Sequence, residues 1–288
     1  KMKYIKYFFQ FILIKIFFII FKLIGYKNSS NLGGIIGSKI GPFLKSKKII
    51  ENNLKNYSPN INNQLINNIS NRMWENYGRI FAEYIFIKDF RSSKLENNLK
   101  INGIEYLNEI KKNRKPVVFV SGHFNNFELM AMQIEKSGIS LAAVYRPLNN
   151  IFLNKTMEKI RKNFICKNQI KKGISGVREI LTFFKNNTSI AMMIDQRVTE
   201  GIKCDLFNKP AYTTTIPAQL IKKFNCPVVS IYIERKDKVN FEMTINKPMY
   251  FKKIDDLEAI TGNLNLWLEK MISKNPEQWI WTHNRWKM

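Results

Sequence analysis

The chain has 288 residues and a formal net charge of +25, from 47 Lys and Arg residues against 22 Asp and Glu residues. This excess predicts an anionic partner (a nucleic acid, an anionic membrane surface, or an acidic protein or substrate), but no basic block interleaved with aromatic residues supports nucleic-acid binding. Three cysteines without a Cys-x-x-Cys pair or a Cys/His cluster argue against a disulfide framework and a zinc site, so a reducing, cytoplasmic environment is the simpler interpretation.

Residues 4–26 are the predicted membrane segment, and between residues 7 and 24 only Gln10, Lys15 and Lys22 interrupt its apolar stretch. Fourteen Phe, Ile and Leu residues contribute roughly −4 to −8 kcal/mol to insertion, against about +3 kcal/mol for Lys15 near the middle. Insertion is therefore favoured. An interfacial helix is the alternative, but Lys6, Lys15 and Lys22 do not share one face. A cleaved signal peptide fits poorly, because no small-x-small site follows the segment.

Residues 27–99 are predicted to be mainly helical. Gly33, Gly37 and Gly41 recur at intervals of four, which either lets a helix approach another backbone closely or marks a flexible connector. Apolar residues between 73 and 85 follow the spacing of an amphipathic helix, which indicates ordinary core packing.

From residue 100 the pattern alternates between strand and helix, which predicts an α/β fold with a mostly parallel sheet flanked by helices. No internal repeat or second linker interrupts it. We therefore expect one α/β domain over 27–288, with 27–99 as its helical N-terminal part and 100–288 as its catalytic part. The predicted strands are 117–121, 141–145, 189–194, 228–234 and 241–245, and the predicted helices are 125–136, 152–163, 176–185, 216–224 and 257–273.

The stretch V-V-F-V-S-G-H-F-N-N-F-E, residues 117–128, is predicted to be a buried strand, a turn and the start of a helix. His123 then lies at the carboxyl end of a strand, where open α/β sheets keep their reactive groups, and Glu128 lies in the first helical turn. If Glu128 accepts from one imidazole nitrogen, the other can take a proton from a hydroxyl. A chance pairing without function is the alternative, although the chain has only two histidines.

Two further strands end in charged or polar residues. Arg146, in Tyr-Arg-Pro, follows the strand 141–145, and Arg suits bidentate recognition of phosphate. A surface Arg beside a proline in a turn is the alternative. Asp195 and Gln196 follow the strand 189–194, where a helix-capping Asp is the simpler explanation.

Basic residues and glycines also precede a predicted helix over 171–178, where free backbone N–H groups favour anions. Such glycine-rich turns are common, so this signal is weak. The closing segment P-E-Q-W-I-W-T-H-N-R-W contains Trp279, Trp281 and Trp286. These tryptophans form a membrane-facing or pocket-lining patch or, alternatively, a packed core element. We interpret His283 as structural.

Taken together, these motifs resemble the lipid A secondary acyltransferases, a branch of the H-x-x-x-x-[D/E] glycerolipid acyltransferase superfamily. The motifs occur in the family's order: H-F-N-N-F-E, Y-R-P, D-Q, L-F-N-K-P-A-Y-T and the tryptophan-rich tail. Departures are Asn125 where the family has a small residue, Phe127 for Trp, and Leu206 and Asn208 for Phe and Gly. These departures put the donor chain length and the pocket shape in question.

The resemblance implies a glycerolipid acyltransferase-like fold, anchored in the inner membrane with its catalytic part on the cytoplasmic side. It also implies an acyl chain carried on acyl carrier protein and an anionic lipid A precursor as acceptor, with no metal or other cofactor. His123 and Glu128 would be catalytic. Arg146 and Arg178 would bind the lipid phosphate, and Asp195 and Gln196 would organise the substrate pocket.

Three alternatives to this function stay open. The same chemistry on another lipid, such as a lysophospholipid or glycolipid, is the first. A catalytically silent, membrane-bound lipid-binding protein is the second, although an intact His-Glu unit counts against it. A basic nucleic-acid binder is the third, and it would be released from membranes by high salt.

Overall fold

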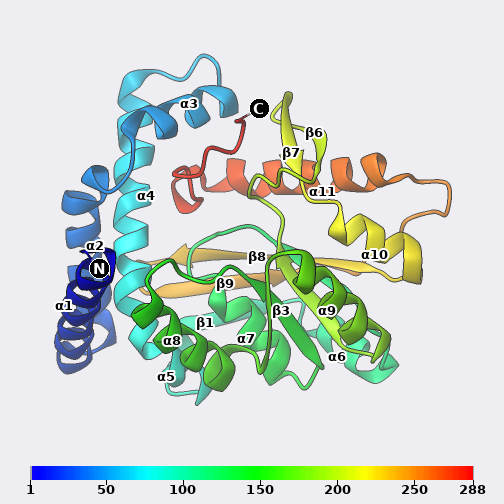
Figure 1. Ribbon diagram of the computed structural model, residues 1–288, viewed down its shortest axis with the longest axis horizontal. Helices are drawn as coiled ribbons and strands as arrows, with labels where there is room; N and C mark the ends of the chain where they lie inside the picture. The colour runs from blue at the N-terminus through cyan, green and yellow to red at the C-terminus, as the bar shows by residue number, and fades with distance from the viewer. Residues whose placement is uncertain (1, 288) are drawn as a thin grey trace.

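The computed structural model describes residues 2–287. Its central element is a seven-stranded sheet (Figure 1). The strands of the described chain are β1 (Leu99–Asn102), β2 (Val118–Ser121), β3 (Leu141–Tyr145), β4 (Asn168–Lys171), β5 (Ser189–Met193), β6 (Ile202–Leu206), β7 (Lys209–Thr213), β8 (Val228–Lys236) and β9 (Asn240–Ile245). The sheet has the order β1-β9-β8-β2-β5-β3-β4, and β6 and β7 form a separate antiparallel hairpin. Strands β8, β2, β5, β3 and β4 run parallel, whereas β9 is antiparallel to β8 and parallel to β1.

Helices surround this sheet and precede it in the chain. They are α1 (Met2–Ile24), α2 (Tyr26–Ile40), α3 (Lys47–Tyr57), α4 (Asn63–Glu83), α5 (Ile87–Arg91), α6 (Ile104–Asn113), α7 (Glu128–Lys136), α8 (Ile151–Ile160), α9 (Ile174–Lys185), α10 (Ile216–Phe224) and α11 (Leu257–Lys274). Short turns extend some of them: η2 (Tyr84–Phe86) continues α4, η4 (Arg161–Ile165) is a π-helical turn after α8, and η5 (Pro276–Gln278) follows α11.

Each face of the sheet has its own core, because successive side chains of a strand point to opposite faces. Val118 and Val120 of β2 pack in a cluster with residues of α9, α10 and the first half of α11. Phe119 belongs to a second cluster on the other face, with residues of α6, α7 and the N-terminal helices. All four residues of β2 are buried, as expected for a continuous apolar run at the centre of a parallel sheet.

The glycine stripe of α2 packs against α4. A Cβ atom on Gly33 would lie 2.4 Å from the carbonyl oxygen of Gly78, and one on Gly37 would lie 2.3 Å from that of Trp74. A Cβ on Gly41 would meet the Trp74 ring at 2.4 Å. The predicted close approach of two helices is therefore confirmed, and the alternative of a flexible connector is wrong.

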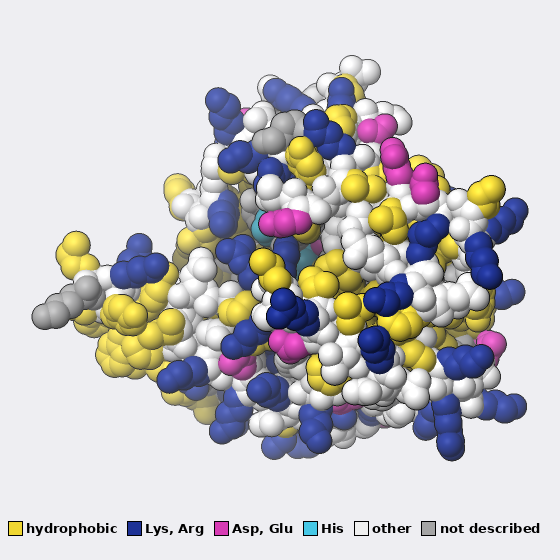
Figure 2. Space-filling view, turned by 45° about the vertical axis from the view of Figure 1, so that its right-hand side comes forward, with side chains coloured by type: hydrophobic (Ala, Val, Ile, Leu, Met, Phe, Trp, Pro, Cys, Tyr) yellow, Lys and Arg dark blue, Asp and Glu magenta, His cyan; other side chains and the backbone are white. Residues whose placement is uncertain are grey.

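Helix α1 lies beside α4 in Figure 1 and carries many exposed apolar side chains, which project from the body in Figure 2. Among the residues described it is the one helix long and apolar enough to cross a membrane. Phe18 and Phe21 are its buried residues, and both rings pack against Phe81 of α4. Its other end touches α8, where Phe8 meets Phe152.

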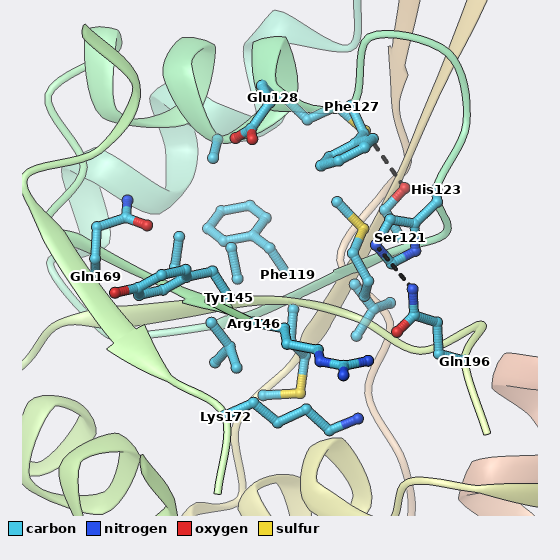
Figure 3. Close-up of a pocket in the computed structure, with 18 of the residues that line it drawn as sticks. Phe119, Ser121, His123, Phe127, Glu128, Tyr145, Arg146, Gln169, Lys172 and Gln196 are labelled. Carbon is cyan, nitrogen blue, oxygen red and sulfur yellow. Dashed lines mark hydrogen bonds between the residues drawn. The ribbon is translucent and has the colours of Figure 1, made fainter. Parts of the chain in front are cut away.

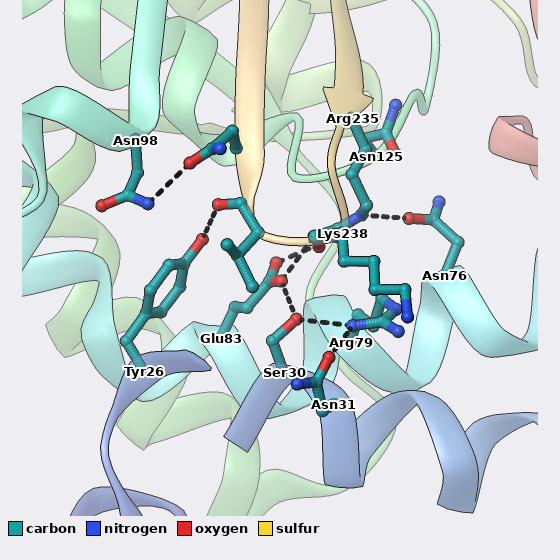
Figure 4. Close-up of polar contacts among 12 residues, drawn as sticks. Tyr26, Ser30, Asn31, Asn76, Arg79, Glu83, Asn98, Asn125, Arg235 and Lys238 are labelled. Atoms are coloured by element: carbon teal, nitrogen blue, oxygen red, sulfur yellow. Dashed lines mark hydrogen bonds and ion pairs between the residues drawn. The ribbon is translucent and has the colours of Figure 1, made fainter. Parts of the chain in front are cut away.

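Buried polar contacts join the N-terminal helices to the β8–β9 hairpin (Figure 4). Arg235 of β8 donates to both carboxylate oxygens of Glu83 in α4, at 2.5 and 3.0 Å. Ser30 of α2 donates to the same carboxylate at 2.7 Å, and the Tyr26 hydroxyl donates to the carbonyl oxygen of Val239 at 2.7 Å. Removing one partner of such a buried pair is strongly destabilising, so these contacts fix α2 and α4 against the sheet.

The predicted fold class is confirmed: a mostly parallel mixed sheet flanked by helices follows a long apolar helix and a helical segment. The five predicted strands and five predicted helices after residue 100 all occur, with shifts of up to three residues at their ends. The prediction missed β1, β4, α6 and the β6–β7 hairpin. The tryptophan-rich tail is a packed core element, with Trp279, Trp281 and Trp286 all buried, so a membrane-facing patch is wrong for it.

Candidate active site

The loop between β2 and α7 carries His123 and is fixed by the C-terminal part of the chain. Asn125 in this loop has a φ of 44°, a left-handed conformation that Asn adopts more readily than most other residues. Its Nδ2 donates to the carbonyl oxygen of Ile233 at 3.0 Å and to Oε1 of Gln278 at 2.6 Å. Asn125 therefore anchors the loop. It stands at the position where the family that the sequence resembles has a small residue.

His123 is paired with Asp195, which follows the neighbouring strand. Strands β2 and β5 are parallel with Ser121 opposite Met193, so the residues two positions further on also lie side by side. Nδ1 of His123 lies 2.7 Å from Oδ1 of Asp195, and the backbone N–H of His123 donates to Oδ2 at 2.7 Å. This second contact fixes the loop as well as the ring.

The Asp195 carboxylate is held ionised. Its side chain has 0% exposure, and it accepts a further hydrogen bond from Nε1 of Trp279 at 2.8 Å. Burial raises the pKa of Asp195, but the charge of His123 and the hydrogen bonds outweigh it and lower the pKa to about 2. An ionised acceptor beside Nδ1 keeps the proton on Nδ1, which leaves Nε2 as the basic nitrogen.

Glu128 is paired with a residue that the sequence interpretation did not single out. Nε and Nη2 of Arg161 donate to Oε1 of Glu128 at 2.8 and 2.5 Å. The prediction that Glu128 accepts from the His123 imidazole is therefore wrong, because Asp195 occupies that position at Nδ1. Figure 3 shows His123 and Glu128 facing one cavity from separate places, with the Phe127 ring beside the imidazole.

His123 and Glu128 line a cavity of 420 Å³. Its inner wall is mostly apolar and includes Phe119, Met130 and Ile134, which come from β2 and α7. In Figure 2 histidine is visible in a hollow of the surface, with several Lys and Arg side chains around it and an acidic side chain beside it. The cavity thus combines an apolar interior, suited to an alkyl chain, with a basic mouth.

Arg146 and Lys172 supply positive charge at this mouth. Tyr145 of β3 pairs with Lys171 of β4, so the next residues leave the two strands at the same level. Both side chains line the cavity, and Figure 3 shows their head groups on the side where Gln196 lies. Desolvation and the charge of Arg146 lower the pKa of Lys172, as expected for two cations that share a small space.

The other predicted substrate-binding residues differ in position. Gln196 lines the cavity, and its amide nitrogen lies 3.4 Å from Nε2 of His123. Arg178 is exposed on α9 and is not among the residues that line the described cavity; Lys172, from the same basic run, takes that place. Asp195 is buried behind His123 and bonded to its ring, so its side chain has no direct access to a substrate.

Other nucleophiles are poorly placed for catalysis. Ser121 lines the cavity, but its hydroxyl donates to the carbonyl oxygen of Ile231 at 2.6 Å. Burial raises the pKa of Cys166 and of Cys226 to about 12, so neither thiol is a nucleophile at neutral pH. His283, interpreted as structural, also lines the cavity, and burial and the charge of His123 lower its pKa. The arrangement favours direct transfer assisted by His123.

Comparisons with known proteins agree with this geometry. A sequence model described as bacterial lipid A biosynthesis acyltransferase matches residues 1–288. The lipid A biosynthesis lauroyltransferase of Escherichia coli is 22% identical over 267 residues, which cover 89% of this chain and 84% of the relative. The lipid A biosynthesis acyltransferase of Haemophilus influenzae is 26% identical over 204 residues, which cover 68% and 62%. The palmitoleoyltransferase of Escherichia coli is 23% identical over 265 residues, which cover 89% and 84%.

Proposed function

This chain belongs to the bacterial lipid A biosynthesis acyltransferase family and is an acyltransferase, and we propose that it moves a fatty acyl chain from acyl carrier protein to a hydroxyl of a lipid A precursor. The observation that carries this proposal is the His123–Asp195 pair on the wall of an apolar cavity with a basic mouth. The apolar interior can hold the alkyl chain of an acyl thioester. The imidazole can remove the proton of the acceptor hydroxyl, and the cations at the mouth can bind the phosphate of the acceptor lipid.

The reaction proceeds by direct attack of the acceptor hydroxyl on the thioester. Nε2 of His123 takes the hydroxyl proton while the oxygen attacks the thioester carbonyl carbon and forms the new C–O bond. The C–S bond then breaks, and the imidazolium returns its proton to the leaving thiolate. Asp195 stabilises the imidazolium between these steps, because its carboxylate lies 2.7 Å from Nδ1.

Glu128 acts through Arg161 in this proposal. Oε1 of Glu128 accepts from Nε and Nη2 of Arg161, which fixes the guanidinium in place. Arg161 lines the cavity, so this guanidinium supplies positive charge where the thioester oxygen becomes negative. Glu128 therefore positions a cation instead of holding the imidazole.

The charge of the protein fits both substrates. Acyl carrier protein is acidic and the lipid A precursor carries phosphates, so a net charge of +25 favours the approach of each. Arg146 and Lys172 are the proposed contacts for a phosphate at the mouth of the cavity. Helix α1 would anchor the enzyme in the inner membrane, with the catalytic part on the cytoplasmic side, where the donor is available.

The test uses purified enzyme with four substrate combinations. Myristoyl thioesters of acyl carrier protein and of coenzyme A are each offered with a phosphorylated or a dephosphorylated tetra-acylated lipid A precursor. Mass spectrometry should show one added acyl group with release of the thiol, fastest for the carrier-protein donor and the phosphorylated acceptor. A lysophospholipid is offered as a further acceptor, and its acylation without acylation of the precursor would contradict the proposed acceptor.

A further inference from the structure

A second hollow, separate from the catalytic cavity, lies between α1, the segment from η2 to α5, and α8. Its volume is 220 Å³. Apolar side chains form most of its wall, including Phe18 and Ile19 of α1 and Ile160 of α8. Three lysines, Lys15, Lys22 and Lys88, also line it, and we call it the lysine-rimmed groove.

The two lysines inside the apolar part of α1 both face this groove. Lys15 and Lys22 are seven residues apart, and this spacing returns to within about 20° of the same helix face. Lys88 joins them from α5. Lys6 lies nine residues before Lys15, which places it about 180° away on the opposite face. The groove is therefore lined by Lys15 and Lys22, the two charged residues within the apolar stretch of α1.

These three lysines have no counter-ion in the described part of the chain. Within residues 2–287 no carboxylate oxygen lies within 4.0 Å of the Lys15, Lys22 or Lys88 ammonium groups. A lysine at membrane depth is costly unless it is paired, and such residues mark binding sites. With α1 in the membrane, as proposed above, the nearest source of negative charge is the phosphate of a lipid.

We propose that the lysine-rimmed groove binds an anionic phospholipid of the membrane. Lys15, Lys22 and Lys88 would hold its phosphate, because their flexible four-carbon stems can bring the ammonium groups to one anion. The first part of an acyl chain would lie against Phe18, Ile19 and Ile160. The site is independent of the reaction proposed for His123, and it explains how α1 keeps two lysines within its apolar stretch.

Native mass spectrometry of the full-length protein in detergent tests this site. Delipidated protein is titrated with phosphatidylglycerol or with phosphatidylcholine of the same acyl chains. The charge variant is K15Q/K22Q/K88Q, and its matched control is K6Q/K94Q/K115Q, which removes the same charge from lysines outside the groove. A second variant, Thr156→Trp, fills the groove and keeps every lysine.

We expect phosphatidylglycerol to bind wild type at least tenfold more tightly than phosphatidylcholine. One lysine beside an anionic lipid raises the affinity for that lipid about fivefold, so the charge variant should bind phosphatidylglycerol about 10²-fold more weakly than wild type. The affinity of the control triple variant should change less than threefold. Thr156→Trp should also lose at least tenfold. Equal binding of the two lipids, equal loss in both triple variants, or unchanged binding by Thr156→Trp would overturn the proposal. Tighter binding of a lipid A precursor than of phosphatidylglycerol at the same lysines would overturn the choice of ligand.

Discussion

Replacing Asp195 with Asn should invert the tautomer of His123. Oδ2 of Asp195 accepts two N–H groups, from the His123 backbone and from Trp279, whereas Oδ1 faces Nδ1 alone. The single amide oxygen of Asn would take the position with two donors, which turns its NH₂ group toward Nδ1. Nδ1 must then accept, so the proton moves to Nε2 and the catalytic nitrogen stops being a base.

The cost of this substitution can be estimated from the carboxylate. The His123 charge and the hydrogen bonds lower its pKa from 3.8 to about 2, which corresponds to a stabilisation of the carboxylate of roughly 2 kcal/mol, or on the order of 10²-fold. Loss of the correct tautomer adds to this, up to the roughly 10⁴-fold known for a His-Asp pair in hydrolases. We therefore expect kcat of D195N to fall by about 10² to 10⁴, with little change in KM.

Trp279→Phe is the matched control, because it removes a hydrogen bond to the same carboxylate and keeps the charge and the Nδ1 contact. Its kcat should fall by less than about tenfold. Both variants are assayed with acyl-carrier-protein donor, with circular dichroism as the folding check. Nitrogen-15 NMR reads the tautomer directly, since the chain has only two histidines. Folded D195N with near-normal kcat, or with its proton still on Nδ1, would refute the reasoning.

Acid stability gives a second readout of the same carboxylate. Because the pKa of Asp195 is lower in the folded state than its ordinary value of 3.8, its ionisation stabilises the folded state at pH values above 3.8. This contribution is lost as the pH falls toward about 2. The difference in unfolding free energy between wild type and D195N should therefore shrink between about pH 4 and pH 2. A difference that stays constant over this range would mean that Asp195 is not held ionised by His123.

Further predictions concern charge and anchoring. Glu128→Gln keeps an acceptor for the guanidinium but loses the charge that orients it, so kcat should fall by about 10- to 100-fold in a single-turnover assay. Arg146→Ala and Lys172→Ala should each raise KM for a phosphorylated acceptor, and Arg178→Ala should have a smaller effect because it lies outside the cavity; equal effects would contradict the assigned contacts. Deleting residues 1–26 should move much of the protein from the membrane to the soluble fraction at low salt, as measured by sedimentation, while the basic surface retains some.

The sequence predicts the parts of the fold that carry strong apolar signals. Runs such as Val117–Val120 identify the central strands because both of their faces are buried. The prediction missed β1 and β4 because they are four-residue edge strands with one buried residue each. The β6–β7 hairpin escaped because its turn uses Phe207 and Asn208, both with positive φ, in place of the glycine that marks most such turns.

The site shows where sequence spacing stops being informative. His123 and Asp195 are 72 residues apart, and only the adjacency of β2 and β5 brings their side chains together. The five-residue spacing to Glu128 suggested a direct contact, but α7 begins at Glu128 and the loop before it turns the two side chains apart. No sequence motif marks Arg161, because its contact with Glu128 depends on the packing of η4 against α7.

Mass spectrometry of lipid A tests the central claim, that His123 is the base for acylation of a lipid A precursor. Cells lacking the protein would be complemented with wild type or with His123→Ala, at equal abundance in the membrane. Wild type should add one fatty acyl chain to lipid A, and His123→Ala should leave the under-acylated form, because loss of a general base costs about 10² to 10⁴-fold in rate. Full acylation by folded His123→Ala protein, or unchanged lipid A with wild type, would contradict this account.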